Sequence, residues 1–238
     1  KFLEELGIEV GSRVTHIHNI EDSSPLDKTI SPNQISKIVD KSPVRCIDKV
    51  IEKQMISVID EAKSNGDSVG GIFEIIATGC PYGLGSPFQW DRKLQAKISA
   101  MMMSVNAFKS IEIGKGSGNA VKFGSEIHDE IGWDGVKFTR FSNNAGGIEG
   151  GMSNTEPIVI RLSMKPIATL TKALRSIDFV TKEGKAAHKE RTDSCAVPAA
   201  SIIAESMLCF VLADAILEKF GGDSISQVKA HMKETGKY

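Results

Sequence analysis

The clearest pattern along the chain is a series of apolar runs whose spacing alternates between that of helices and that of strands. Apolar residues at helical spacing predict a helix over 47–63, and a denser run predicts another over 196–220. Shorter runs predict strands over 10–20, 68–77 and 156–164, a strand followed by a loop over 111–118, and a short strand followed by a charged loop over 174–186. Because strands and helices interleave at hairpin-like spacing, we expect an α+β fold rather than a doubly wound parallel sheet.

Several boundaries follow from local signals. Asp91 is a candidate N-cap of a helix that runs to about Phe108, and Asp223 and Ser224 are candidates to cap a last helix. The segment 21–43 is predicted to be a loop. The helix over 196–220 is apolar nearly all round, which predicts burial between layers. Residues 1–7 have the pattern of the last turns of an amphipathic helix, so we expect sequence to precede them.

Composition and charge exclude several classes of protein. The 238 residues are 41% hydrophobic, enough for one large domain over 1–238 or for two closely packed halves. A net charge of −1, with scattered basic residues, argues against nucleic acid and anionic membranes as partners. The longest dense apolar stretch, 207–213, is short for a membrane span. The four cysteines form no C-x-x-C pair, so no zinc site is predicted and a reduced, cytoplasmic protein is expected.

A run over 143–154 contains two Gly-Gly pairs fenced by asparagines. The first interpretation is a tight double turn between strands. The second is a backbone cradle for an anion or a flat cofactor, since glycine lets N–H groups approach a ligand closely. Two other patterns are weak. Gly114-x-Gly116-x-Gly118 matches no nucleotide fingerprint, and His16 and His18 share a predicted strand face without a third metal ligand.

Three polar clusters adjoin apolar elements and could carry chemistry. They are Asn106–Ala107, Lys165–Thr169 and Arg191–Cys195. We expect Arg191 and Asp193 to lie beside a low-dielectric core at the start of the helix over 196–220, where arginine suits phosphate or carboxylate recognition. A carboxylate held there serves in proton transfer. The alternative is structural: Asp193 and Ser194 cap the helix, and Arg191 pairs with Asp193. Cys195 is interpreted as a packed residue rather than a nucleophile.

Together these motifs resemble those of the chorismate synthase family. The resemblance rests on Asn144-Ala145-Gly146-Gly147-Ile148-x-Gly150-Gly151-Met152-Ser153-Asn154, Lys165-Pro166, Arg191-x-Asp193-x-Cys195 and Pro198. Further matches, in order, are Gly66-Asp67-Ser68-Val69-Gly70-Gly71, Pro81-x-Gly83-Leu84-Gly85-x-Pro87, Asn106-Ala107-x-Lys109, Gly124-Ser125-Glu126 and Val211-Leu212-Ala213-Asp214. The resemblance extends over the whole chain.

The resemblance implies conversion of 5-enolpyruvylshikimate-3-phosphate to chorismate and phosphate, a trans 1,4-elimination that needs reduced FMN without net redox change. It implies a β-α-β sandwich with helices between antiparallel sheets, assembled as a homotetramer. The positions that match the family's FMN contacts are Asn106, Ala107, Gly150, Lys165, Pro166, Ile167, Ala168, Thr169 and Arg191. Arg191 is also implied to lie near the substrate, and Asp193 matches a carboxylate that moves the C6 proton together with the flavin. We expect a concave, water-poor site. Whether NADPH reduces the flavin on the protein stays open.

Two departures from the family pattern qualify these expectations. Thr192 and Ser194 stand where the family usually has histidine and proline. The family's Gly-Glu-Ser-His-Gly motif, its second histidine and its Arg-Ser-Ser-Ala-Arg run are absent from these 238 residues, so we expect this piece alone to be inactive. Two alternatives remain: a non-catalytic module that binds flavin or phosphate, and a structural fragment whose glycines only make turns.

Overall fold

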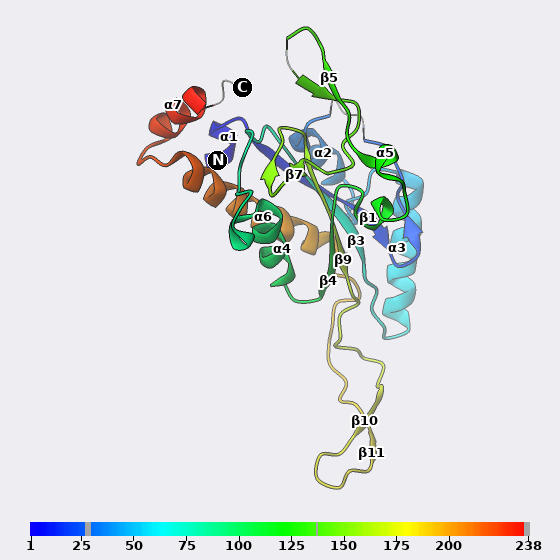
Figure 1. Cartoon of the computed structure of the whole chain (residues 1–238). Coiled ribbons are helices and arrows are strands. Elements are labelled where there is room, and N and C mark those ends of the chain that lie inside the picture. Colours follow the sequence, from blue (N-terminus) through cyan, green and yellow to red (C-terminus); the bar gives the residue numbers. More distant parts are fainter. Residues whose placement is uncertain (27–29, 137, 236–238) are drawn as a thin grey trace.

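An antiparallel sheet of five strands forms the centre of the protein. The computed structural model describes residues 1–26, 30–136 and 138–235. The sheet has the order β2 (Ile20–Glu21), β1 (Glu9–Ile17), β3 (Gly71–Thr78), β9 (Ile158–Met164) and β4 (Phe108–Ile113), and each neighbouring pair is antiparallel (Figure 1). The expected α+β fold is confirmed.

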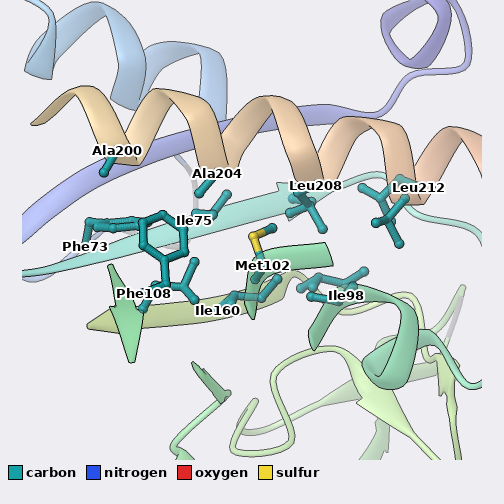
Figure 2. Packing of buried hydrophobic residues seen from close by; sticks show 14 of the residues in the cluster. Phe73, Ile75, Ile98, Met102, Phe108, Ile160, Ala200, Ala204, Leu208 and Leu212 are labelled. Atoms are coloured by element: carbon teal, nitrogen blue, oxygen red, sulfur yellow. The ribbon is translucent and has the colours of Figure 1, made fainter. Parts of the chain in front are cut away.

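Two helices cover one face of this sheet. They are α6 (Val197–Phe220) and α4 (Leu94–Met103). Figure 2 shows the packed layer between helices and sheet, which is made by Phe73, Ile75, Ile98, Met102, Phe108, Ile160, Ala200, Ala204, Leu208 and Leu212. All of these side chains are buried, so the removal of their apolar surface from water is the main force that holds the layers together.

The outer face of α6 departs from the prediction of burial all round. Ile202, Ile203, Phe210 and Leu217 are exposed, and Phe210 keeps 70% of its surface accessible. The helix has 24 residues and a window of mean hydropathy 1.9, so it is long and apolar enough to span a membrane. This apolar segment is longer than the stretch over 207–213 that the sequence analysis identified. Long helices in protein cores meet the same criterion. Within that window 44% of the residues are buried in the protein.

The opposite face of the sheet carries a row of alternating charges. Arg13, Glu74, Arg161 and Glu112 are register neighbours across β1, β3, β9 and β4. The Glu74 carboxylate accepts from Arg13 Nε at 3.3 Å and from Arg161 Nε at 3.2 Å, and Arg161 Nη1 lies 3.9 Å from Glu112. Arg13 and Glu74 are buried, whereas Arg161 and Glu112 are partly exposed, so the row runs from the interior to the surface.

The remaining elements lie around this sheet. The helices are α1 (Phe2–Glu5), α2 (Pro32–Val39), α3 (Lys49–Ser64), α5 (Gly124–Ile127) and α7 (Ile225–Thr235), with 3-10 turns η1 (Trp90–Arg92) and η2 (Gly116–Asn119). The predicted loop over 21–43 therefore contains a helix. Ser31 caps α2 in a reciprocal arrangement with Gln34, and Pro32 occupies its first turn.

The start and end of α4 also differ from prediction. Asp91 lies in η1 and does not cap the helix, because the N-cap position is Lys93. The helix ends at Met103 rather than near Phe108, which is the first residue of β4. Of the three consecutive methionines, Met102 is fully buried and Met103 is exposed, as expected for packing at one face of a helix.

Three short hairpins stand outside the central sheet. They pair β5 (Ile131–Trp133) with β6 (Phe138–Arg140), β7 (Ile148–Glu149) with β8 (Met152–Ser153), and β10 (Arg175–Ile177) with β11 (Gly184–Ala186). Figure 1 shows β5 at the top and β10–β11 at the bottom, at opposite ends of the molecule.

Candidate active site

Two of the three predicted clusters meet where β4 begins and β9 ends. The backbone N–H of Lys165 donates to the carbonyl of Ala107 at 2.9 Å. Ala107 has φ +71°, a left-handed conformation that is uncommon outside glycine. The Asn106–Ala107 and Lys165–Thr169 clusters are therefore in direct contact through their backbones.

A short segment before β3 anchors the third cluster beside the second. Ser68 Oγ donates to the carbonyl of Ile167 at 2.7 Å, and the N–H of Val69 donates to the carbonyl of Ser194 at 2.8 Å. Gly70 lies so close that a Cβ there would come within 2.3 Å of the Met164 carbonyl oxygen. The segment Ser68–Gly70 thus holds the ends of both site segments.

A hydroxyl pair ties the two segments together a second time. Thr169 Oγ1 donates to Thr192 Oγ1 at 2.9 Å, and the Thr192 hydroxyl donates in turn to the carbonyl of Asp193 at 3.1 Å. Sequence reasoning identified Thr192 only as a departure from the family pattern. The structure gives this residue a positioning role, since its hydroxyl links Thr169 to the backbone of Asp193.

The charged side chains of the site are open to solvent. Lys165, Arg191 and Asp193 are exposed, and within the described residues none of their side chains forms a hydrogen bond or an ion pair. The expected position beside a low-dielectric core is therefore wrong for Arg191 and Asp193. The structural alternative is wrong too, because Ala196 occupies the N-cap of α6, no side chain caps this end, and Arg191 does not pair with Asp193.

Cys195 lies next to this site but is poorly suited to react. Burial raises the pKa of its thiol, and a backbone hydrogen bond involving Val197 only partly offsets this effect. A thiol with a raised pKa is protonated at neutral pH and is a weak nucleophile. This agrees with the interpretation of Cys195 as a packed residue.

Gly150 is the predicted FMN contact that lies apart from the others. It forms the turn between β7 and β8, whose neighbour Gly151 accepts a hydrogen bond from the N–H of Leu94 at the start of α4. Asn106 follows the C-terminal end of α4, and Lys165 follows the C-terminal end of β9. Strands rise about 3.3 Å per residue, so the ends of the seven-residue β9 lie about 20 Å apart.

The glycine-rich run itself forms tight turns, which is the first of its two interpretations. Asn143 Oδ1 accepts from the N–H of Gly147 at 2.8 Å, and a Cβ at Gly146 would lie 2.2 Å from the Gly114 nitrogen. Close packing of the two glycine-rich loops therefore explains Gly114 and Gly146. Gly150 differs, because a Cβ there would meet no atom within 4 Å.

Asp129 fixes the start of this run. It accepts hydrogen bonds from Ser142 Oγ at 2.5 Å, the N–H of Asn144 at 2.7 Å and the N–H of Ala145 at 2.9 Å. Burial acts to raise the pKa of Asp129, but these hydrogen bonds outweigh it and lower the pKa below its ordinary value.

A hollow between α1, α2 and α6, with Phe2, Ile8 and Phe210 in its lining, lies away from the candidate site. The expectation of a concave, water-poor site around Arg191 and Asp193 stays a prediction. The part of the chain that the structure describes contains no group of three potential metal ligands. The predicted strand also ends at Ile17, with His18 in a turn at φ 54°, so His16 and His18 do not share a strand face.

A family model and curated relatives match this chain. The family model for chorismate synthase matches residues 1–217. Over its whole length the chain is 48% identical to chorismate synthase 2 of Bacillus cereus (strain ATCC 14579), and also 48% identical to chorismate synthase 2 of Bacillus thuringiensis (strain Al Hakam). It spans 61% of the length of each of these relatives.

A solved structure extends the comparison to the fold. A crystal structure of chorismate synthase superposes with a TM-score of 0.81 at 40% sequence identity, over 98% of this chain and 64% of that one. These matches do not favour a non-catalytic module of another class. The chain belongs to the chorismate synthase family.

Proposed function

We propose that this chain carries the flavin site and part of the substrate site of a chorismate synthase. The reaction is the trans 1,4-elimination of phosphate from 5-enolpyruvylshikimate-3-phosphate, which gives chorismate for aromatic amino acid biosynthesis. The observation that carries the proposal is the position of two exposed cations, Lys165 and Arg191, on segments that Ser68 and Val69 hold side by side.

The residues present fit an anionic, flat cofactor. Lys165 and Arg191 have no partner among the described side chains, so a phosphate or a carboxylate could pair with both without breaking an existing ion pair. Ala107, which has a left-handed backbone, lies beside Lys165 because its carbonyl accepts from the Lys165 N–H. FMN contacts are proposed at Asn106, Ala107, Gly150, Lys165, Pro166, Ile167, Ala168, Thr169 and Arg191.

Each charged residue then has a defined role. Arg191 orients the anionic substrate, and Lys165 stabilises the negative charge of the phosphate as it departs. Asp193, an exposed carboxylate two residues from Arg191, accepts the proton that leaves the substrate carbon. Reduced flavin, when bound, supplies the electron donation on which the elimination depends. The same proposal includes NADPH as the reductant of the flavin, a homotetramer and a cytoplasmic location. It also includes partners that are neither nucleic acid nor a membrane.

Flavin binding to the 238-residue chain tests the proposal directly. We expect FMN to bind, with its fluorescence quenched, and Arg191→Ala and Lys165→Ala each to weaken binding by about tenfold or more. Lys115→Ala is the matched control, because Lys115 is an exposed lysine at the opposite end of β4. Equal affinity in all four proteins would overturn the proposed site.

An assay of chorismate formation distinguishes flavin binding from catalysis. Under anaerobic conditions with reduced FMN, we expect this chain to form no chorismate, because it lacks the histidine motifs that the family resemblance implies. In a complete protein that contains them, Asp193→Asn should lower kcat while leaving FMN affinity within a factor of about two. Turnover by the isolated chain would contradict the inferred need for those motifs.

A further inference from the structure

The carboxylate of Glu149 belongs to the residue that directly precedes Gly150, at the tip of the β7–β8 hairpin. Arg140 Nη2, from β6 in the hairpin at the top of Figure 1, lies 2.7 Å from Glu149 Oε2. Asn154 Nδ2 donates to the same oxygen at 2.8 Å. The other end of the guanidinium, Arg140 Nη1, donates to the Asp129 carbonyl at 2.8 Å. An arginine from one hairpin therefore holds a carboxylate on the tip of another.

The turn between β7 and β8 has other anchors, and these carry no charge. Gly150 and Gly151 have φ of +59° and +96°, the left-handed conformation that a type I′ loop requires at both central residues. The Gly151 carbonyl accepts from the N–H of Leu94 at 2.8 Å, and Met152 pairs with Gly85 in an isolated bridge. These neutral contacts fix the turn independently of the Glu149 side chain.

The exposure of the ion pair indicates that its main contribution is not to folding. The side chain of Glu149 keeps 41% of its surface accessible, and that of Arg140 keeps 19%. Ion pairs that are this open to solvent add little to the unfolding free energy, because water and salt screen them. Their effect on a nearby charged ligand is a separate matter. While Arg140 is in place, the pair as a whole carries no net charge.

Charge at this tip matters because of the residue beside it. Gly150 is exposed, and it is one of the proposed FMN contacts, so the inference drawn below rests on the proposed function. FMN is a phosphate monoester and therefore an anion at neutral pH. Consecutive Cα atoms are about 3.8 Å apart, so the Glu149 carboxylate and a ligand at Gly150 interact within about one Debye length, 10 Å at 0.1 M salt. An uncompensated glutamate here would repel the cofactor.

We propose that Arg140 is a positioning residue for FMN that acts through Glu149: it holds the carboxylate against Asn154 and cancels its charge beside the Gly150 contact. The planar guanidinium suits this task, because one nitrogen meets the carboxylate while another is fixed by the Asp129 carbonyl. Arginine also keeps its charge throughout the pH range in which proteins are folded, so the compensation does not depend on pH.

FMN titrations of the wild type, Arg140→Ala, Glu149→Gln and the double variant test this role. Arg140→Ala leaves the Glu149 carboxylate uncompensated, so we expect the FMN dissociation constant to rise about tenfold at about 0.02 M salt. Glu149→Gln keeps an oxygen for Asn154 and removes the negative charge, so it should bind FMN at least as tightly as the wild type. The double variant should return to within a factor of about two of the wild type.

Salt and amide exchange distinguish compensation of charge from mechanical support of the turn. The defect of Arg140→Ala should shrink to about twofold or less at about 1 M salt, where the Debye length is about 3 Å. Amide exchange over 148–153 without FMN should change by less than about threefold, because the neutral anchors remain. Arg140→Lys retains the positive charge and should recover most of the affinity at low salt.

The ion pair between Lys229 of α7 and Glu5 of α1, with 3.1 Å between Nζ and Oε2, provides the matched control. Lys229→Ala also leaves a glutamate without its cation, yet it should not change FMN affinity, because neither residue adjoins a proposed contact. An equal loss of affinity in this control would show a general effect of net charge and would overturn the role of Arg140.

The outcomes also separate this inference from the proposed function. Wild-type FMN affinity in Arg140→Ala, a defect that persists in the double variant, or a defect that 1 M salt does not reduce overturns the role of Arg140. If Arg191→Ala still weakens binding in that case, the proposed function stands. Absence of FMN binding by the wild-type chain overturns the proposed function, and this inference with it.

Discussion

The hydroxyl of Thr169 donates a hydrogen bond to the hydroxyl of Thr192 at the base of the β10–β11 hairpin, with the two oxygens 2.9 Å apart. Twenty-three residues separate these threonines in the sequence. Their contact brings the segment that contains Lys165 next to the segment that contains Arg191 and Asp193. The site therefore depends on a neutral residue pair as much as on its charged side chains.

Loss of this pair should loosen the site without unfolding the protein. Thr192→Val keeps the shape of the side chain and removes its hydroxyl, so the Thr169 hydroxyl loses its acceptor and the Asp193 carbonyl its donor. We expect a loss of about 1 kcal/mol in unfolding free energy and faster amide exchange over 169–172 and 190–193. Thr192→Ser should restore slow exchange, and failure of serine to do so would show that the methyl group, not the hydroxyl, matters.

Ser68→Ala should disturb the same site through the backbone of Ile167. It removes the donor to the Ile167 carbonyl, at a cost of about 1 kcal/mol in unfolding free energy measured in urea, together with weaker FMN binding. Ser64→Ala is the matched control, because Ser64 Oγ donates to the Glu61 carbonyl at 2.8 Å on the exposed end of α3. If both variants bind FMN equally, Ser68 has no positioning role.

Among the charged residues of the row on the sheet, Glu74 is predicted to cost the most unfolding free energy when it is substituted. Glu74→Gln leaves the guanidinium groups of Arg13 and Arg161 without the carboxylate that both contact, and Arg13 is buried. Breaking a buried ion pair on one side costs about 3–5 kcal/mol. Glu112→Gln, at the more exposed end of the row, should cost about 1 kcal/mol or less. Denaturant unfolding measures both.

The glycine before β3 is expected to be intolerant of a side chain for a steric reason. Gly70→Ala places a Cβ 2.3 Å from the Met164 carbonyl oxygen and 2.9 Å from Pro166 N, so the start of the Lys165–Thr169 segment must move. We expect lower stability and weaker FMN binding in the same variant. Gly118→Ala should be neutral, because Gly118 has no atom near the position of a Cβ. A stable Gly70→Ala protein with normal FMN affinity would contradict this account.

Asp129 should make stability depend on pH in the acid range. Hydrogen bonds lower its pKa in the folded state below the ordinary value, so its contribution is complete above the pKa of the unfolded chain, near pH 4, and is lost as pH falls through the folded pKa. Asp129→Asn should therefore be less stable at pH 7 and show a flatter decline of unfolding free energy between about pH 5 and pH 2. An unchanged acid slope would rule out this role.

The sequence indicated most of the core but few of the tertiary contacts that bring the site segments together. Apolar spacing located α6 and the strands β3 and β9 because their side chains pack on one continuous layer. It missed α2, although Ser31, Pro32 and Gln34 are the signature of a capped helix start, because polar residues surround its few apolar positions. Family motifs named Lys165 and Arg191. They could not show that Ser68, 99 residues away from Ile167, holds the two segments together, since tertiary contact sets that distance.

The anchoring of the two site segments has a thermodynamic consequence. Ser68 Oγ binds the Ile167 carbonyl and the Val69 N–H binds the Ser194 carbonyl, so the segments on both sides of the β10–β11 hairpin share one attachment point. Ordering of this attachment point therefore narrows the range of positions open to Lys165 and Arg191. By reciprocity, an anion that fixes the two cations must stabilise the attachment of both segments.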